Sequence, residues 1–419
     1  WNGRRVVMFL KGMVGMGRGR DVCLVHIFYL ICHYCIRMSK LIGEGGFGCV
    51  FYPGFSCDGK VDSSKNKNEF VSKVQRKDNS SKNEVVIGNK IQTIPSYKLY
   101  FAPIIKSCDV GMSKINTNIL SKCSIYEKFK HDTDLSLFKL NYIKNVELQD
   151  QLLKGSKKEA IASFCDIYRH ILTGIELLGK KNIVHFDIKK ENIIYDTTRS
   201  LPIIIDFGLS FVFDKSTKLD DLYSNVFYVV APEYYLWPLE VHFANSIMNV
   251  GDVVNLTVEE VKSLCDKYIS NCKGFEIFSD SFKTKYLESS FAFLSKYIGR
   301  KRKDVLKEII GFSKTWDNYA VGIMSMRLLG NMFSRGFVYN ETIINISQVL
   351  LETCNPNPTR RISVSETKKR FEKCFHTEDN VSGFAKMMDE MHEINDELRM
   401  TLRNDDKHLN KTIENALQK

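Results

Sequence analysis

The stretch that most constrains this chain is residues 185–192, His-Phe-Asp-Ile-Lys-Lys-Glu-Asn, which follows an apolar helical run. Residues 206–208, Asp-Phe-Gly, begin fourteen positions after Asn192. Together these stretches supply two carboxylates, an ammonium group and an amide on short loops. Phosphoryl transfer from a metal-bound nucleotide needs such a set, because one group orients the attacking hydroxyl, oxygens bind Mg²⁺ and positive charge faces the moving phosphoryl group. Phosphoryl transfer is therefore the working hypothesis.

Composition bounds the size, partners and compartment of the protein. The 419 residues, 44% of them hydrophobic, are enough for roughly two or three domains. The formal net charge of +11 favours acidic partners such as nucleotide, nucleic acid, acidic peptide or an anionic membrane, with scattered solvated lysines as the alternative. The twelve cysteines lack regular spacing, which predicts reduced thiols in a cytosol-like compartment.

The two ends of the chain differ from its middle. Residues 1–37 are interpreted as a leader whose place in the mature protein stays open, and its apolar run, residues 21–36, leaves a membrane anchor as an alternative. That run is short for a span of about 20 residues. Residues 376–419 are predicted to form an amphipathic helical tail, with apolar residues mostly three and four apart from position 384. Residues 377–419 could pack on the same domain or serve an oligomer contact.

A glycine pattern marks the first ordered segment. Gly43, Gly45 and Gly48 are followed by Val50 and lie among β-type residues. Glycines let a hairpin backbone approach phosphates closely. A dinucleotide-binding fold would need a helix opening at the third glycine, whereas residues 53–54, Pro-Gly, follow a strand-like run here. A hairpin lid over a nucleotide is the better prediction.

Lys73 lies in an alternating, strand-like segment, and an inward-facing lysine needs an anionic partner. Glu84 opens a helical run with Ile87 and Ile91 and is the candidate partner. Two alternatives stay open. Lys73 could face water, and Glu84 could complete a capping box with Ser81 at the helix start.

Taken in order, these motifs resemble the eukaryotic-type protein kinase superfamily over residues 41–375. The resemblance rests on the glycine pattern, Lys73, Glu84, residues 185–192 and 206–208, Ala231-Pro232-Glu233, Asp317 with Gly322, and Arg361. It implies an α+β bilobal kinase fold, with a small antiparallel β N-lobe at residues 38–141 and a larger, mainly helical C-lobe at residues 142–375. Residues 234–316 would include a long helical insertion that is atypical of the family.

The resemblance also implies roles. Asp187 would orient the substrate hydroxyl and accept its proton, Lys189 would stabilise the γ-phosphoryl charge, and Asn192 and Asp206 would hold Mg²⁺, or Mn²⁺ in its place. Lys73 would grip the ATP phosphates and pair with Glu84. The residues implied in nucleotide binding are Ile42, Gly43, Gly45, Gly48, Val50, Lys73, Glu84, Leu140, Asn141, Tyr142, Ile143 and Ile194.

Two further implications concern the hinge and the C-lobe. Leu140 would be the gatekeeper, with residues 141–143 as the hinge facing adenine, although residues 126–128 have a comparable pattern. Glu233 would form a buried ion pair with Arg361. Lys189, two residues after Asp187, is typical of serine/threonine kinases rather than tyrosine kinases.

Departures from the family pattern carry expectations of their own. Phe186 stands where the family has an arginine that meets an activation-loop phosphate, so we expect activity without that phosphate. Val71 and Ser72 also differ from the family pattern. Both changes are small, and we expect both residues to lie near the adenine. The long segment before Asp317 and the short helix after Lys73 resemble kinases encoded by large DNA viruses.

The leading hypothesis is an ATP- and Mg²⁺-dependent serine/threonine protein kinase with a protein substrate. The alternatives are a pseudokinase or scaffold on the same fold, a small-molecule kinase of related fold, and a charge-driven nucleic-acid binder, the partner we least expect. The expected location is the cytoplasm, which would be the host cytoplasm for a viral protein.

Overall fold

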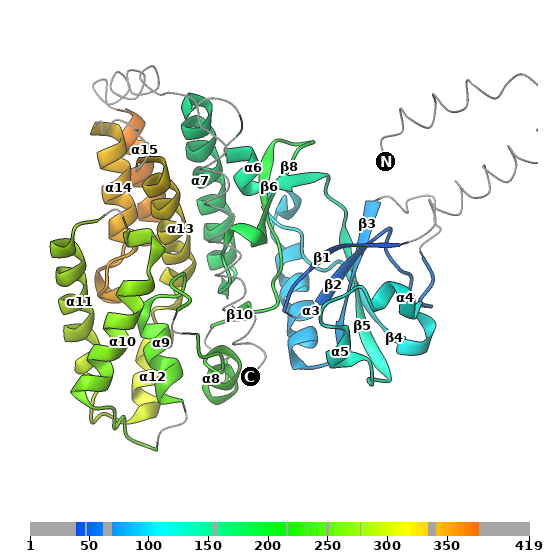
Figure 1. Ribbon diagram of the computed structural model, residues 1–419, viewed down its shortest axis with the longest axis horizontal. Helices are drawn as coiled ribbons and strands as arrows, with labels where there is room; N and C mark the ends of the chain where they lie inside the picture. Colours follow the sequence, from blue (N-terminus) through cyan, green and yellow to red (C-terminus); the bar gives the residue numbers. More distant parts are fainter. Residues whose placement is uncertain are drawn as a thin grey trace, which may run out of the picture.

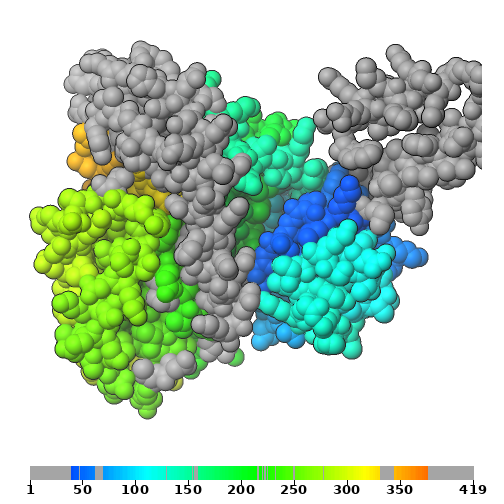
Figure 2. Space-filling view, viewed as in Figure 1, coloured from blue at the N-terminus to red at the C-terminus, as the bar shows by residue number. Residues whose placement is uncertain are grey.

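The computed structural model describes residues 39–376 apart from 47, 62–68, 153, 155–156, 215–216, 232, 249–250, 277 and 334–340. Two lobes make up this part of the chain (Figure 1). The leader at residues 1–37 and the tail at residues 377–419 lie outside the described residues. In the space-filling view the N-lobe, coloured blue to cyan, lies to the right, and the C-lobe, coloured mainly green to yellow, lies to the left (Figure 2).

The N-lobe is a five-stranded antiparallel sheet in the order β1-β2-β3-β5-β4. Its strands are β1 (Lys40–Glu44), β2 (Gly48–Tyr52), β3 (Phe70–Arg76), β4 (Lys106–Gly111) and β5 (Asp134–Asn141). One face packs on an apolar core under the short helices α4 (Thr117–Leu120) and α5 (Tyr126–Phe129). Because side chains alternate across a strand, Val74 enters that core while Lys73 faces the other side, towards the second lobe.

Helix α3 (Asn79–Gln92) follows β3 and buries Ile87 and Ile91, which lie four residues apart on one face. Asp78 caps its start, because the Asp78 carboxylate accepts a hydrogen bond from the Ser81 backbone N–H at 2.8 Å. Ser81 therefore occupies the third position of the capping box, and the alternative in which Glu84 completes that box is wrong. Glu84 lies one turn inside the helix and is free to project towards β3.

The C-lobe is built around α7 (Lys157–Lys180), whose apolar stripe is buried as its spacing predicts. Helices α13 (Trp316–Phe333) and α15 (Val364–His376) pack against α7, and α14 (Glu341–Thr353) packs on both (Figure 1). Short strands at the boundary between the lobes carry the functional loops. They are β6 (Asn145–Glu147), β7 (Ile183–Val184), β8 (Ile193–Asp196), β9 (Leu201–Ile204) and β10 (Phe211–Val212), with α6 (Leu148–Leu152) beside them.

The segment before α13 forms a helical subdomain at the lower left of Figure 1. It follows α8 (Leu219–Val226) and contains α9 (Leu239–Ile247), α10 (Val258–Asn271), α11 (Asp280–Ser295) and α12 (Arg302–Ile310). Helices α9 to α12 all lie within residues 234–316, where a long helical insertion was expected. Helices α10 to α12 pack on α9 and on one another, away from the boundary between the lobes.

Candidate active site

The loop at residues 185–192 joins β7 to β8 and is held from below by the start of α13. Asp317 accepts hydrogen bonds from the backbone N–H groups of His185, at 2.8 Å, and Phe186, at 2.9 Å. Burial raises the pKa of Asp317, while the two backbone donors act in the opposite direction. Phe186 has a positive φ of 68°, a backbone conformation that residues other than glycine rarely adopt. The Asp317 carboxylate therefore stabilises an unusual turn.

Asp187 is the centre of this loop and is almost fully buried. One oxygen of its carboxylate, Oδ2, accepts a hydrogen bond from the Asn192 amide nitrogen at 2.8 Å and lies 3.0 Å from the Lys189 ammonium nitrogen. The other oxygen, Oδ1, accepts a hydrogen bond from the Tyr234 hydroxyl at 2.7 Å. The sequence analysis did not single out Tyr234, because no local pattern connects it to a loop 47 residues earlier.

Lys73 links the two sides of the cleft. Its ammonium group donates to both oxygens of Glu84, at 2.9 and 3.0 Å, and to Asp206 Oδ1 at 2.9 Å. The predicted pairing with Glu84 is therefore present, and the solvent-facing alternative is wrong. Burial alone would lower the pKa of Lys73, but the charges of Asp206 and Glu84 raise it above its usual value. The lysine is positively charged in this arrangement.

Asp206 lies two residues after the end of β9, with a positive φ of 59°. Burial alone would raise the pKa of Asp206, but Lys73 and, further away, Lys189 lower it to about 2. The neighbouring Phe207 is buried against His185, with 4.9 Å between the ring centroids. Packing of Phe207 into the C-lobe thus aims the Asp206 carboxylate at Lys73.

The donor set fits Mg²⁺ bound together with a nucleotide. The Asn192 amide nitrogen donates to the backbone oxygen and side chain of Asp187, which leaves the amide oxygen as the coordinating group. Asp206 supplies a carboxylate with a low pKa. Among the described residues, no cluster of three or more His, Cys, Asp or Glu side chains could hold a metal alone. Mg²⁺ commonly takes one or two protein oxygens together with substrate phosphates and water, which matches this pair.

Every residue predicted for the site lines a cavity of about 390 Å³ between the lobes. Its volume lies within the usual range for small-molecule sites. The predicted residues that line it are Ile42, Gly43, Gly45, Gly48, Val50, Lys73, Glu84, Leu140, Asn141, Tyr142, Ile143, Asp187, Lys189, Asn192, Ile194 and Asp206. Sequence reasoning missed Ala102 and Ile205, whose apolar side chains join the lining from outside the motifs.

The glycine-containing turn between β1 and β2 covers this cavity. The Gly45 backbone N–H donates to the Gly48 carbonyl at 3.0 Å, which closes the turn. A side chain at Gly48 would meet the Val74 carbonyl at 2.7 Å, so the close approach of β2 to β3 requires glycine there. The strand after this turn is tied to the far side of the N-lobe by the disulfide between Cys49 and Cys123.

The two candidate hinge segments lie in different parts of the N-lobe. Residues 140–143 line the cavity, whereas residues 126–128 lie in α5, which packs behind the sheet. Val71 also lines the cavity, as expected near an adenine. Ser72 does not. Its hydroxyl exchanges hydrogen bonds with the Phe55 backbone on the opposite face of β3, so the expectation for Ser72 is wrong.

Phe186 lies in an aromatic cluster, where the family pattern has a charged arginine. Its ring stacks on Trp237, with 4.6 Å between centroids, and contacts Phe211 and Trp316. The Trp237 indole N–H donates to the Phe186 carbonyl at 2.6 Å. Apolar packing and one neutral hydrogen bond therefore connect residues 185–192 to the later segments that carry Phe211 and Trp237.

The predicted ion pair between Glu233 and Arg361 is wrong. Arg361 pairs with Glu240, whose Oε2 accepts from Arg361 Nη2 at 2.8 Å, and both side chains are 1% exposed. Glu233 is exposed in the turn before α9, whereas Glu240 lies in the first turn of α9 and faces inwards. The Ala-Pro-Glu pattern identified the right region but the wrong carboxylate, because the helix start sets which side chain points inwards.

The prediction of reduced thiols is wrong for four of the cysteines. Disulfides join Cys49 to Cys123 and Cys57 to Cys108, all in the N-lobe. The five C-lobe cysteines within the described residues are free and buried. The pairs are 74 and 51 residues apart in sequence, and only the sheet brings their partners together.

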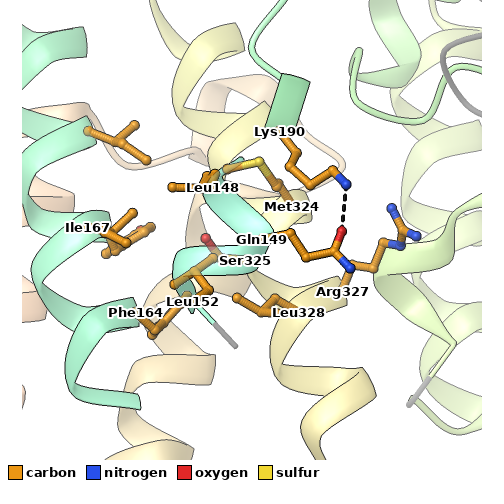
Figure 3. Close-up of a pocket in the computed structure, with 12 residues that line it drawn as sticks. Leu148, Gln149, Leu152, Phe164, Ile167, Lys190, Met324, Ser325, Arg327 and Leu328 are labelled. Carbon is orange, nitrogen blue, oxygen red and sulfur yellow. Dashed lines mark hydrogen bonds between the residues drawn. The ribbon is translucent and has the colours of Figure 1, made fainter. Parts of the chain in front are cut away.

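Below the loop at residues 185–192 lies a smaller, mainly apolar cavity of about 60 Å³ between α6, α7 and α13. Lys190 reaches into its edge, and its ammonium group donates to Gln149 Oε1 of α6 at 2.5 Å (Figure 3). Arg327 of α13 lies beside this pair (Figure 3). The contact braces the second half of the catalytic loop, where Asn192 lies.

Together, the sheet-based N-lobe, the helical C-lobe and the cleft between them define the bilobal protein-kinase fold. Residues 36–242 match the family described as the protein kinase domain. The match ends two residues after Glu240, so the helices from α10 onwards lie beyond it. Fold and match together show that this part of the chain is similar to the protein kinase domain.

Curated relatives point to the same superfamily. A rice (Oryza sativa subsp. japonica) calcium and calcium/calmodulin-dependent serine/threonine-protein kinase is 29% identical over 170 residues, which cover 39% of this chain and 30% of the relative. Calcium-dependent protein kinase 3 of Plasmodium yoelii yoelii is 27% identical over 247 residues, covering 56% of this chain and 40% of the relative. Calcium-dependent protein kinase 4 of Plasmodium falciparum is 37% identical over 90 residues, 21% of this chain and 17% of the relative. The chain thus spans less than half the length of these relatives.

The calls on the two ends of the chain fall outside the described part. The membrane alternative for residues 21–36 and the oligomer contact at residues 377–419 therefore stay predictions. Within residues 39–376 as described, every helix is too short or too polar to cross a membrane.

Proposed function

We propose that this chain is an active protein kinase that transfers the γ-phosphoryl group of ATP to a serine or threonine hydroxyl of a protein. The observation that carries the proposal is the bridge made by Lys73, which bonds Glu84 and Asp206 at the same time. This bridge is formed at one end of a cavity whose other groups include Asp187 and Lys189. Phosphoryl transfer depends mainly on positioning and charge, and these groups supply both.

Each residue has a proposed part. Lys73 would bind the α- and β-phosphates, and Asn192 and Asp206 would hold Mg²⁺ or Mn²⁺, which neutralises charge on the phosphates when bound. Asp187 would orient the substrate hydroxyl and take its proton. Lys189, 3.0 Å from Asp187, would stabilise charge on the transferred group.

The adenine would lie between apolar side chains of the two lobes. Val50 and Val71 come from the N-lobe sheet, and Ile194 comes from β8 in the C-lobe. The backbone of residues 141–143 connects the two walls and offers hydrogen-bonding groups at the cavity edge. An apolar slot with a few polar groups is the usual form of a nucleotide-base site.

The test is a peptide-array phosphorylation assay with purified full-length protein, ATP and Mg²⁺, followed by phosphoamino-acid analysis. We expect phosphoserine or phosphothreonine. Lys73→Met should reduce the rate by about 100-fold or more. A matched control is Lys139→Met on the neighbouring strand β5, outside the cavity lining, which should keep the rate. Equal rates in the two variants would refute the site, and phosphotyrosine alone would refute the hydroxyl preference.

The pseudokinase alternative is separated by Asp187→Asn. An active kinase should lose phosphoryl transfer in this variant while nucleotide binding survives, because Asp187 lies on the loop at residues 185–192, whereas the proposed adenine walls come from β2, β3 and β8. A wild-type protein that binds ATP but transfers nothing would favour the pseudokinase. Activity on free sugars or amino alcohols, with none on protein, would favour the small-molecule kinase.

Location and origin are separate proposals. The cytoplasm stays the proposed location, but its argument from reduced cysteines no longer holds for the four N-lobe cysteines that form disulfides. Cell fractionation with thiol labelling would test it. The resemblance to kinases of large DNA viruses stays a prediction, and we do not expect a nucleic-acid partner.

A further inference from the structure

Tyr234 makes a contact that the kinase motifs do not include. Its hydroxyl donates to Asp187 Oδ1 at 2.7 Å, and the whole residue is buried, with 0% exposure. Burial, and then the charge of Asp187, raise the pKa of Tyr234 well above its usual value, so the phenol stays protonated and acts as a donor. The hydrogen bond is thus a neutral donor facing a carboxylate.

The tyrosine ring is mounted rigidly on the C-lobe. Its backbone N–H donates to the Ala231 carbonyl at 2.9 Å, and its own carbonyl lies 3.1 Å from His242 Nε2 in α9. The ring packs edge-on against Trp237, with 5.1 Å between centroids. Trp237 in turn stacks on Phe186, next to Asp187. The hydroxyl therefore has a fixed position relative to the catalytic loop.

The donors at Asp187 are divided between its two oxygens. Asn192 and Lys189 approach Oδ2, and Tyr234 approaches Oδ1. A carboxylate oxygen has two acceptor positions, so the tyrosine takes one at Oδ1 and leaves the other for a substrate hydroxyl. Without Tyr234, the Oδ1 side would lose the donor that holds the carboxylate against rotation.

We propose that Tyr234 is a positioning residue for phosphoryl transfer, which fixes the orientation of the Asp187 carboxylate. The inference rests on the proposed function, because it assigns Tyr234 to the same reaction. It also makes the segment before α9 part of the active site by a direct hydrogen bond. The charged and titratable groups around the pair are Lys189, Glu191, His185, Asp206 and Tyr235, and the test leaves all of them unchanged.

The first test is Tyr234→Phe in the full chain, which keeps the ring and removes the hydroxyl. We expect kcat to fall about 10- to 100-fold, the usual effect of losing a hydrogen bond to a charged group, with KM for ATP unchanged. Rates measured at saturating ATP should show the loss in kcat, because the carboxylate loses the donor that fixes its orientation.

Two matched variants separate positioning from structure. Tyr223→Phe removes a buried hydroxyl that has no hydrogen-bond partner among the described residues, and it should change neither kcat nor KM. Tyr268→Phe removes a buried hydroxyl that donates to the Tyr235 carbonyl at 2.9 Å, and it should lower stability without lowering kcat. If Tyr234→Phe behaves like either control, the proposal is overturned.

A second variant keeps the proposal testable if Tyr234→Phe folds poorly. Incorporation of 4-aminophenylalanine at position 234 keeps a ring and an N–H donor, and it should recover part of the lost rate. Equal rates for the 4-aminophenylalanine and phenylalanine variants at position 234 would contradict a role for the hydrogen-bond donor.

A readout that needs no catalysis separates this inference from the proposed function. In ¹³C NMR of labelled protein at one fixed pH, the Asp187 carboxyl resonance should change position or broaden in Tyr234→Phe, because the carboxylate loses the donor that fixes its rotation. A wild-type protein without phosphoryl transfer would refute the proposed function. An Asp187 resonance that is identical in wild type and variant would refute the positioning role of the hydrogen bond.

Discussion

The ion pair between Glu240 and Arg361 gives the sharpest test of the fold. Glu240→Gln keeps the shape of the side chain and an acceptor for the Trp316 indole N–H, which donates to Glu240 Oε1 at 3.0 Å. It removes the charge opposite an arginine whose side chain is 1% exposed. Removing one partner of a buried pair typically costs about 3–5 kcal/mol, because the other charge stays buried without compensation.

The assay is urea and thermal unfolding of the full-length protein, followed by tryptophan fluorescence. For a lobe of this size, we expect the C-lobe transition to fall by about 10 °C, since each kcal/mol lowers Tm by about 2–4 °C. The control is Glu233→Gln, because Glu233 is exposed and its substitution should change the unfolding free energy by less than about 0.5 kcal/mol. A larger loss for Glu233→Gln than for Glu240→Gln would refute the assignment.

Three further predictions concern regulation, pH and the disulfides. Phosphatase-treated protein should keep its full rate, because Phe186 contacts aromatic rings instead of a phosphate, and an inactive treated protein would contradict this. The pKa of Asp206 is lowered to about 2 in the folded protein. The ionised carboxylate therefore contributes to stability above the unfolded pKa of about 4, and this contribution is lost as pH falls towards 2. Between pH 5 and pH 2.5, the free energy of urea unfolding should fall less in Asp206→Asn than in wild type. Replacing Cys49 and Cys123 by serine should reduce N-lobe stability by about 4 kcal/mol, given the 74-residue separation, and unchanged unfolding would argue against this disulfide.

The parts of the site that lie close together in sequence were predictable from sequence. Asp187, Lys189 and Asn192 fall within six residues, so one short motif names all three, although Asp317 of a distant helix holds the turn before them. The glycine-containing hairpin and the strand with Lys73 were also predictable, because alternation and glycine spacing are local signals. The predicted residues consequently line one cavity.

Contacts between distant segments were predicted poorly unless a family pattern named both partners. Lys73 and Glu84 are eleven residues apart, and the pairing was found. Arg361 is 121 residues from Glu240, and the motif pointed to an exposed carboxylate instead. The sequence offered no sign of which cysteines meet across the sheet.

By itself, then, the sequence determined the parts of the candidate site: a glycine-containing hairpin, an inward lysine, and two loops that carry acidic residues. Only the tertiary structure decided which groups complete that chemistry. The start of α9 turns Glu240 inwards towards Arg361, and the segment before it brings the Tyr234 hydroxyl to Asp187. The physical reason is that a hydrogen bond depends on distances of a few tenths of an ångström, which packing of whole elements sets and local sequence does not.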